Sequence, residues 1–260
     1  MTIKRLVIDA LGSLLPRRVR QGVVNLGFNL DQEQFQRLAT RYLFAPDMRL
    51  ALEGLADRGF QPGTVLDIGA FEGNWSKMAM EIWPEAEFTL IEANPDKAAM
   101  LRRDPVLAAT KVVENLLGPS DGAEVTFHVM ESGSSVYEEH SDVERQSVTL
   151  KQRTLDSIMK DQDGADFIKI DVQGYELEVL KGGQATLSNA EIVLIELSLI
   201  EINEGAPLLD EALGFMRAAG FVAYDLLEIH RRPLDGAMNQ VDVLFVQEDS
   251  PLRTDKRHWA

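Results

Sequence analysis

The sequence predicts an α/β domain whose doubly wound, mostly parallel sheet carries helices on both faces. Two observations carry this prediction. From residue 64 onward, short β-branched runs alternate with segments whose apolar residues recur at helical spacing, and a turn containing two glycines follows the first of these strands. Such alternation requires right-handed crossovers, which place successive strands parallel in one sheet. Ligands of such sheets bind outside the carboxyl ends of the strands, so we look there for a site.

The elements are expected in a regular order. Strands are predicted at 64–68, 88–92, 111–114, 167–171, 192–196, 221–226 and 241–246, and helices at 74–82, 96–103, 155–160, 175–182 and 208–219. Two runs at 124–129 and 147–152 alternate polar with apolar residues, which indicates an antiparallel insertion between the third and fourth core strands.

Residues 1–60 precede the sheet and read as helices. Asp31 could cap one helix, and Pro46 could begin another that ends near Gly59. We therefore predict an N-terminal helical extension at 1–60, a single α/β domain at 61–248 and a C-terminal tail at 249–260.

Composition restricts the function. The 260 residues carry a formal net charge of -16 and include no cysteine. Disulfides and thiolate metal sites are therefore excluded, and a reducing, cytoplasmic location is expected. A nucleic-acid enzyme usually presents a basic face and stacking aromatics. With aromatics at only 7% and an acidic balance, we predict no nucleic-acid partner.

Residues 1–20 form a basic amphipathic pattern. Lys4 and Arg5 precede apolar residues at helical spacing, Asp9 interrupts them, and further arginines follow. The apolar run is far shorter than the roughly 20 residues that a membrane span needs. Two interpretations stay open. The helix could rest on an anionic membrane surface, or it could pack on its own domain or on a second subunit of a homodimer.

The turn after the first strand points to a nucleoside cofactor without phosphates. Gly69 lets the backbone turn sharply beside a ligand, and Gly73 lets the next helix begin close to the strand. Phe71 stands where a dinucleotide-binding turn would place its middle glycine, and Asp67 would repel a pyrophosphate. The cofactor residues predicted from this turn are Asp67, Gly69, Ala70, Phe71, Gly73 and Asn74.

The second strand adds a carboxylate to this turn. Glu92 ends the strand and is followed by Ala93 and Asn94. A carboxylate at this position can accept hydrogen bonds from both ribose hydroxyls, while Asp67 could face an ammonium group. This pair of acids favours S-adenosylmethionine (SAM) over NADP, whose extra phosphate Glu92 would repel.

Five sequence blocks resemble the FkbM-family methyltransferases over about residues 64–246. These blocks are the segment Asp67–Ser76, Ser132-Gly-Ser-Ser135, Thr154-Leu-Asp-Ser157, Phe167-Ile-Lys-Ile-Asp-Val-Gln-Gly-Tyr-Glu176 and Leu180-Lys-Gly-Gly183. The family usually has glutamate in place of Gln173 and often asparagine in place of Phe71.

The resemblance implies a seven-stranded, Rossmann-like class I methyltransferase sheet whose last strand is antiparallel. It also implies O-methylation of a hydroxyl on a sugar, a glycan or a secondary metabolite. Ser134 and Ser135 are assigned to the cofactor by the resemblance alone.

Methyl transfer from a sulfonium needs a positioned acceptor and a group that takes the hydroxyl proton. Asp171 ends the fourth core strand and, with Val172, could also contact the cofactor. Glu196 ends the fifth strand, and His230 is expected in the loop between the last two strands. We predict Asp171, Glu196 and His230 as catalytic candidates, with Glu176 bracing the Asp171 loop. The buried Lys169 should need a carboxylate partner.

Other interpretations remain open at this point. Asp171, Glu196 and His230 could converge on Mg²⁺, but no ligand spacing demands it, so we predict no metal site. Arg231 and Arg232 could contact an anionic acceptor. An NAD-dependent oxidoreductase and a non-catalytic SAM-binding scaffold are the alternative functions.

Overall fold

The computed structural model describes residues 46–130, 134–138, 140, 145–162 and 164–258. The predicted helices before residue 46, including the basic segment 1–20, lie outside the described residues. The chain divides into two units, Met1–Asp47 and Met48–Ala260, and the second is described here by itself. Within the described residues, no helix is both long and apolar enough to cross a membrane.

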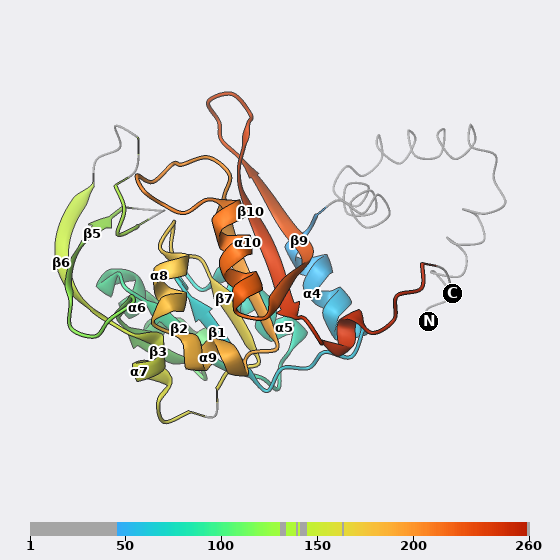
Figure 1. The fold of residues 1–260 in the computed structure, drawn as a ribbon. Helices are drawn as coiled ribbons and strands as arrows, with labels where there is room; N and C mark the ends of the chain where they lie inside the picture. Colours follow the sequence, from blue (N-terminus) through green and yellow to red (C-terminus); the bar gives the residue numbers. More distant parts are fainter. Residues whose placement is uncertain (1–45, 131–133, 139, 141–144, 163, 259–260) are drawn as a thin grey trace, which may run out of the picture. The chain divides into compact units, whose positions relative to one another are not determined.

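A seven-stranded sheet forms the centre of this unit (Figure 1). Its strands are β1 (Thr64–Ile68), β2 (Glu87–Glu92), β3 (Lys111–Glu114), β7 (Phe167–Ile170), β8 (Ile192–Ser198), β9 (Phe221–Arg231) and β10 (Met238–Gln247). Their order is β3-β2-β1-β7-β8-β10-β9. β10 pairs antiparallel with both β8 and β9, and the other neighbouring pairs are parallel, so β10 alone runs against the direction of the other six strands. The predicted doubly wound sheet is confirmed, and the strand order reverses between β1 and β7.

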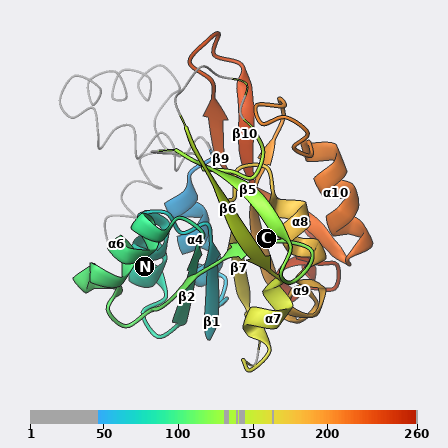
Figure 2. The same ribbon diagram turned by 90° about the vertical axis from the view of Figure 1, so that its left-hand side faces the viewer.

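Helices cover both faces, as predicted. One face carries α4 (Met48–Asp57), α5 (Asn74–Ile82) and α6 (Pro95–Arg103), and the other carries α7 (Leu155–Met159), α8 (Glu176–Lys181), α9 (Gln184–Asn189) and α10 (Leu209–Ala218). Figure 2 shows α4 and α6 on one side of the strands and α8, α9 and α10 on the other. The short helix α9 was not among the predicted elements.

Alternation along the strands divides the apolar side chains between two cores. Val65 of β1 and Phe167 of β7 pack on one face with Trp83, the residue that follows α5. Leu66 and Ile168, the next residue of each strand, pack with the helices of the opposite face. The same alternation decides which polar side chains share a face at the carboxyl ends of the strands.

Helix α4 lies within the segment that we assigned to the N-terminal extension, and it packs on the sheet. Leu52 and Leu55 are fully buried in the same core as Val65 and Trp83. Gly59 follows the helix with a φ of 94°, a left-handed conformation that glycine adopts readily. The helix therefore belongs to the same compact unit as the sheet.

A smaller three-stranded sheet stands beside the large one, in the order β4-β6-β5. It consists of β4 (Leu116–Leu117), β5 (Glu124–Val129) and β6 (Gln146–Arg153). The antiparallel pairing of β5 with β6 confirms the predicted insertion. The two-residue strand β4, which pairs parallel with β6, was not predicted.

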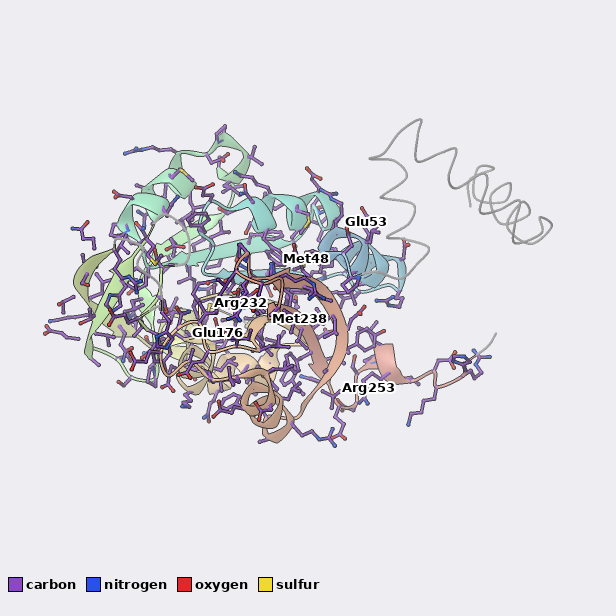
Figure 3. All side chains as sticks on the ribbon, turned by 90° about the horizontal axis from the view of Figure 1, so that it is seen from above. Met48, Glu53, Glu176, Arg232, Met238 and Arg253 are labelled. Carbon is purple, nitrogen blue, oxygen red and sulfur yellow. The ribbon has the colours of Figure 1, made fainter. Side chains whose placement is uncertain are left out.

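The last two strands are longer than predicted. β9 continues to Arg231, and β10 begins at Met238, so His230 lies on a strand and not in a loop. The end of β9 is rich in polar residues because β9 is an edge strand. It stays paired with β10 through register shifts, and the sequence does not reveal these. Figure 3 looks onto the domain from above and labels Arg232 and Met238, at the hairpin ends of these strands.

Candidate functional site

A cavity of about 250 Å³ opens at the carboxyl edge of the sheet. The turn after β1, the ends of β2 and β3, strand β5 and the loop after β7 form its walls. Its lining consists of Ile68, Gly69, Phe71, Ile91, Glu92, Ala93, Asn94, Asn115, Leu116, Leu117, Phe127, Ser134, Val136, Asp171, Val172, Gln173, Tyr175 and Val179. The cavity lies where the strand order reverses, which is where this type of sheet binds ligands.

The glycine turn brings two loops into close contact. Gly69 has a φ of 77°, and a Cβ atom at this position would lie 1.8 Å from the carbonyl oxygen of Asp171. Gly73 has a φ of 72°, and a Cβ atom there would meet Leu107 at 2.6 Å and Leu101 at 2.9 Å. Both glycines are therefore required by the backbone, as the sequence predicted. Gly69 lines the cavity, whereas Gly73 is buried behind it.

Phe71 lies on the turn with a left-handed φ of 50°. Phe71 is one of the residues that line the cavity, and the Nζ atom of Lys97 lies 4.0 Å from the centroid of its ring. Lys97 also forms a 2.7 Å ion pair with Glu72. The positive charge is thus held against the ring and a neighbouring acid.

The carboxylate of Glu92 is held by two backbone N–H groups, one from the turn after β1 and one from the loop after β2. Its Oε2 atom accepts a 2.8 Å hydrogen bond from the N–H of Phe71, and its Oε1 atom accepts a 2.7 Å bond from the N–H of Asn94. Burial raises the pKa of Glu92 above its usual value, although these backbone hydrogen bonds oppose the change. The side chain of Asn94 turns away to cap α6, accepting from the N–H groups of Asp96 and Lys97.

A buried ion-pair cluster lies beneath the cavity. Lys169 of β7 contacts Asp67 of β1 at 3.4 Å and Asp171 at 3.1 Å. Asp67 also accepts a 2.6 Å hydrogen bond from the hydroxyl of Ser76. Burial alone would lower the pKa of Lys169, but Asp171 and Asp67 raise it above the usual lysine value. The expected carboxylate partner of Lys169 is confirmed, and there are two of them.

Asp171 lies directly after β7 and is ionised by its surroundings. Burial would raise the pKa of Asp171, but the Lys169 ammonium and the Gln173 amide outweigh it, and the pKa falls below its usual value. Glu176 braces the loop as predicted, accepting from the N–H groups of Val172 at 3.1 Å and Gly174 at 2.9 Å. Burial raises the pKa of Glu176 to about 7.

Glu196 lies on the same sheet face, within β8 and two residues before its end. Its Oε2 atom accepts hydrogen bonds from the side-chain amides of Gln173 at 2.8 Å and Gln240 at 2.7 Å. Burial raises the pKa of Glu196 well above its usual value, and the neighbouring carboxylates of Asp171 and Asp242 raise it further. The pKa of Asp171 is thus lowered and that of Glu196 is raised, although the amide of Gln173 bonds both carboxylates.

His230 belongs to this cluster through Asp242, which the sequence did not single out. The Nε2 atom of His230 lies 2.9 Å from Asp242 Oδ2 and 3.9 Å from Glu196 Oε1. The hydrogen bond to Asp242 raises the pKa of His230. Cross-strand pairing accounts for the cluster, because Asp242 stands opposite Glu196 on one side and Glu228 on the other.

Three potential cation ligands lie close together on β9 and β10, and of the residues considered above for Mg²⁺ only His230 is among them. Ligand atoms of Glu228, His230 and Asp242 all lie within 4.8 Å of one another. His230 and Asp242 already bond each other in this arrangement.

The cavity contains eight of the predicted cofactor residues, which are Gly69, Phe71, Glu92, Ala93, Asn94, Ser134, Asp171 and Val172. The other five do not line it, namely Asp67, Ala70, Gly73, Asn74 and Ser135. Asp67 is fully buried below the turn, and Ser135 bonds the carbonyl of Gln173. Of the catalytic candidates, Asp171 lines the cavity. Glu196 does not line it but bonds the lining residue Gln173, and His230 lies next to Glu196.

Several lining residues were missed by the sequence analysis, including Asn115, Phe127 and Gln173. Asn115 directly follows β3, and its N–H bonds the carbonyl of Glu92 at 3.1 Å, so its place at a strand end could have identified it. Phe127 lies on β5 of the three-stranded sheet, and no rule about strand ends points to a residue in the middle of that strand. Arg231 and Arg232 do not line the cavity. Arg232 pairs with Asp235 and Arg231 bonds the carbonyl of Gly236.

Comparison with known proteins gives one family match. The family described as "Methyltransferase FkbM domain" matches residues 67–223. No curated protein sequence matches the chain.

The solved structures that resemble this chain are distant from it in sequence. A precorrin-6y C5,15-methyltransferase from Geobacter metallireducens GS-15 is 14% identical, with 76% of this chain and 86% of that chain covered and a TM-score of 0.45. A putative RNA methyltransferase from Pyrococcus horikoshii is 13% identical, with 77% and 81% covered and a TM-score of 0.45. Magnesium protoporphyrin IX methyltransferase from Synechocystis PCC 6803, solved with bound SAM, is 11% identical, with 76% and 79% covered and a TM-score of 0.45.

Proposed function

Because this chain belongs to the FkbM methyltransferase domain family, we propose that it is a SAM-dependent O-methyltransferase acting on a hydroxyl of a sugar, a glycan or a secondary metabolite. Such an enzyme must hold a nucleoside cofactor and an acceptor at one edge of the sheet, with the hydroxyl aligned on the methyl group. The residues around the cavity fit each of these requirements.

The charge of the cavity lining is the observation that carries the choice of cofactor. Among the described lining residues, the charged side chains are Glu92 and Asp171, and both are acids. A dinucleotide would bring two phosphates against these carboxylates, and no described lining residue is a lysine or an arginine. SAM has no phosphate and carries an ammonium and a sulfonium group, so an acidic lining attracts it.

Different parts of the lining have different chemical character, and each part suits one part of the SAM molecule. Glu92, held by two backbone N–H groups, would accept from the ribose hydroxyls. Leu116, Leu117 and Phe127 provide an apolar wall, and Asn115 a polar group, for the adenine. Asp171 would face the cationic end. When bound, SAM supplies a methyl group on a positively charged sulfur, which needs no acid to leave.

The acceptor is expected to be neutral or cationic. Asp171, Glu196 and Asp242 line up on one face of the sheet, where Lys169 and His230 are the basic groups beside them. The arginines of the hairpin are engaged by Asp235 and by a backbone carbonyl. A hydroxyl on an uncharged or amino-bearing molecule therefore suits this edge better than a phosphorylated one.

Calorimetric titration of SAM, S-adenosylhomocysteine (SAH) and NAD⁺ tests the cofactor. We expect SAM and SAH to bind and Glu92→Ala to weaken them at least about tenfold, which is about 1.4 kcal/mol. Glu87→Ala is the matched control, because Glu87 is an exposed acid at the opposite end of the same strand. Binding of NAD⁺ without SAM would instead support an oxidoreductase.

Transfer itself is tested with labelled SAM and a panel of hydroxyl compounds. Methylation of a sugar or polyketide hydroxyl supports the proposal, and methylation confined to nitrogen or carbon acceptors contradicts the O-methyl assignment. Tight SAM binding with transfer to no acceptor would favour a scaffold.

A further inference from the structure

Gln173 connects two carboxylates with a single amide group. Its Nε2 atom lies 2.8 Å from Asp171 Oδ1 and 2.8 Å from Glu196 Oε2. A side-chain amide has two N–H hydrogens, so each carboxylate receives one of them. The distance between the two acids is therefore set by one rigid planar group.

The backbone of Gln173 is held in place for this role. Its φ is 55°, in the left-handed region that costs a residue with a Cβ atom roughly 1 kcal/mol or more. Its carbonyl oxygen accepts from Ser135 Oγ at 2.7 Å and from Asn203 Nδ2 at 2.8 Å. Both donors are buried. A strained conformation that neighbours hold so firmly points to a functional constraint.

The two carboxylates differ in what else they bind. Asp171 uses both oxygens, because Oδ1 bonds Gln173 and Oδ2 pairs with Lys169. Glu196 uses Oε2 for two amides, those of Gln173 and Gln240. Within the described residues, Oε1 of Glu196 receives no hydrogen bond, and it lies 3.9 Å from His230 Nε2. Glu196 thus keeps one oxygen available, whereas Asp171 does not.

We propose that Gln173 is a positioning residue that holds Asp171 and Glu196 as a fixed pair, and that Oε1 of Glu196 accepts the proton of the acceptor hydroxyl. This inference rests on the proposed function. In the step, the hydroxyl oxygen bonds the methyl carbon as the carbon–sulfur bond breaks. The sulfur keeps that electron pair and becomes a neutral thioether, while the hydroxyl proton passes to Oε1. Gln240 acts as a second positioning residue on Oε2.

The proton affinity of Glu196 fits a proton acceptor better than that of Asp171 does. A group that takes a proton works best when its pKa lies near the working pH. Burial raises the pKa of Glu196, whereas Lys169 keeps the pKa of Asp171 low. The charged groups that act on Glu196 are Lys169 and Asp171 at the end of β7, Glu176 of α8, His230 of β9 and Asp242 of β10.

A carboxyl titration tests the pair without any acceptor. The protein would be labelled with ¹³C at the glutamate side-chain carboxyl, and Glu196→Gln would identify the Glu196 signal. We expect Glu196 to titrate above the usual glutamate value of about 4.3. Gln173→Leu and Gln240→Leu should each move the midpoint upward, because each removes a donor to the ionised form. Asp171→Asn should move it downward by removing a like charge.

Gln247→Leu is the matched control, because Gln247 lies at the other end of β10 and bonds the carbonyl of Ala190. Gln240→Leu keeps the test valid if the left-handed position 173 does not tolerate leucine. The inference is overturned if the Glu196 midpoint is the same in the wild type, Gln173→Leu and Gln240→Leu.

Kinetics separate this inference from the proposed function. Glu196→Gln should lower kcat by about 10²- to 10⁴-fold, with the Kd for SAM unchanged. Gln173→Leu and Gln240→Leu should move the acid limb of the pH profile of kcat to higher pH, whereas a purely structural role would lower kcat equally at every pH. If the wild type methylates a hydroxyl and Glu196→Gln does so at a similar rate, the inference fails and the proposed function stands. If the wild type methylates no hydroxyl, the proposed function fails, and the titration still decides whether Gln173 joins the two acids.

Discussion

Asp67 and Lys169 occupy the same register position on adjacent strands, and their charged groups lie 3.4 Å apart, closed off from solvent. Lys169 is also the cation nearest to Asp171. A buried ion pair adds little net stability compared with apolar residues, but removal of one partner leaves an uncompensated charge. The lysine therefore allows two acids, Asp67 and Asp171, to lie close together at the carboxyl edge of the sheet.

Lys169→Met should destabilise the fold by about 3–5 kcal/mol, because it leaves Asp67 and Asp171 without their shared cation. The free energy of unfolding in urea measures this effect. Lys160→Met, at an exposed lysine, is the control and should change it by less than about 0.5 kcal/mol. The double variant Asp67→Asn with Lys169→Met should recover part of the loss, and a double variant that is merely additive would contradict the coupling.

Gly69→Ala should abolish SAM binding or folding, because its Cβ would lie 1.8 Å from a backbone oxygen. Gly59→Ala is the matched control. Gly59 also has a positive φ, but nothing lies within 4 Å of its Cβ position, so only backbone strain of about 1–2 kcal/mol is expected there. Thermal unfolding and SAM titration of both variants make the comparison. Equal effects would mean that strain alone, and not the contact between the two loops, explains the glycine.

Leu52→Ala tests whether α4 is part of the domain core. A fully buried leucine lost from a packed core costs about 2–5 kcal/mol. Leu234→Ala serves for comparison, because Leu234 is 82% exposed at the hairpin and its loss should be nearly neutral. A neutral Leu52→Ala in urea unfolding would show that the helix contributes nothing to the stability of the sheet.

His230 should make stability depend on pH. The folded state raises the pKa of His230 above 6.5 because the imidazole bonds Asp242. The contribution is therefore fully present below about pH 6.5 and is lost as the pH rises through the raised value. We expect the difference in unfolding free energy between wild type and His230→Gln to shrink over that range. This pH-dependent difference in unfolding free energy should be small, because the His230 side chain is 36% exposed and water screens its charge. Asp242→Asn should remove the pH dependence of this difference, and a difference that grew with pH would contradict the assignment.

Features encoded in neighbouring residues were predictable from the sequence. The glycine turn, Glu92 at a strand end and Asp171 at another all follow from local periodicity together with the rule that parallel strands end at one edge. The same rule would have found Asn115, which follows β3. Bracing by Glu176 was also predictable, because a side chain at the start of a helix can reach back to the preceding loop.

Contacts that depend on register between distant strands were not predictable. Gln240 reaches Glu196 across 44 positions, and Asp242 reaches His230 across 12. Each contact depends on which residues face each other in β8, β10 and β9, and the bulges in the β9–β10 pairing shift that register. The sequence predicts a loop at the end of β9 because this part of the edge strand has no continuous apolar run.

The reversed direction of β10 has a consequence for synthesis of the protein. An antiparallel strand begins at the edge where its parallel neighbours end, so Gln240 and Asp242 come from the start of the last strand. A ribosome-bound chain that has exposed only β1 to β8 already contains the cofactor turn, Glu92 and Asp171. It still lacks the second amide on Glu196, and it lacks both His230 and its partner Asp242. The polar cluster around Glu196 is thus completed only when the last hairpin, β9 with β10, emerges.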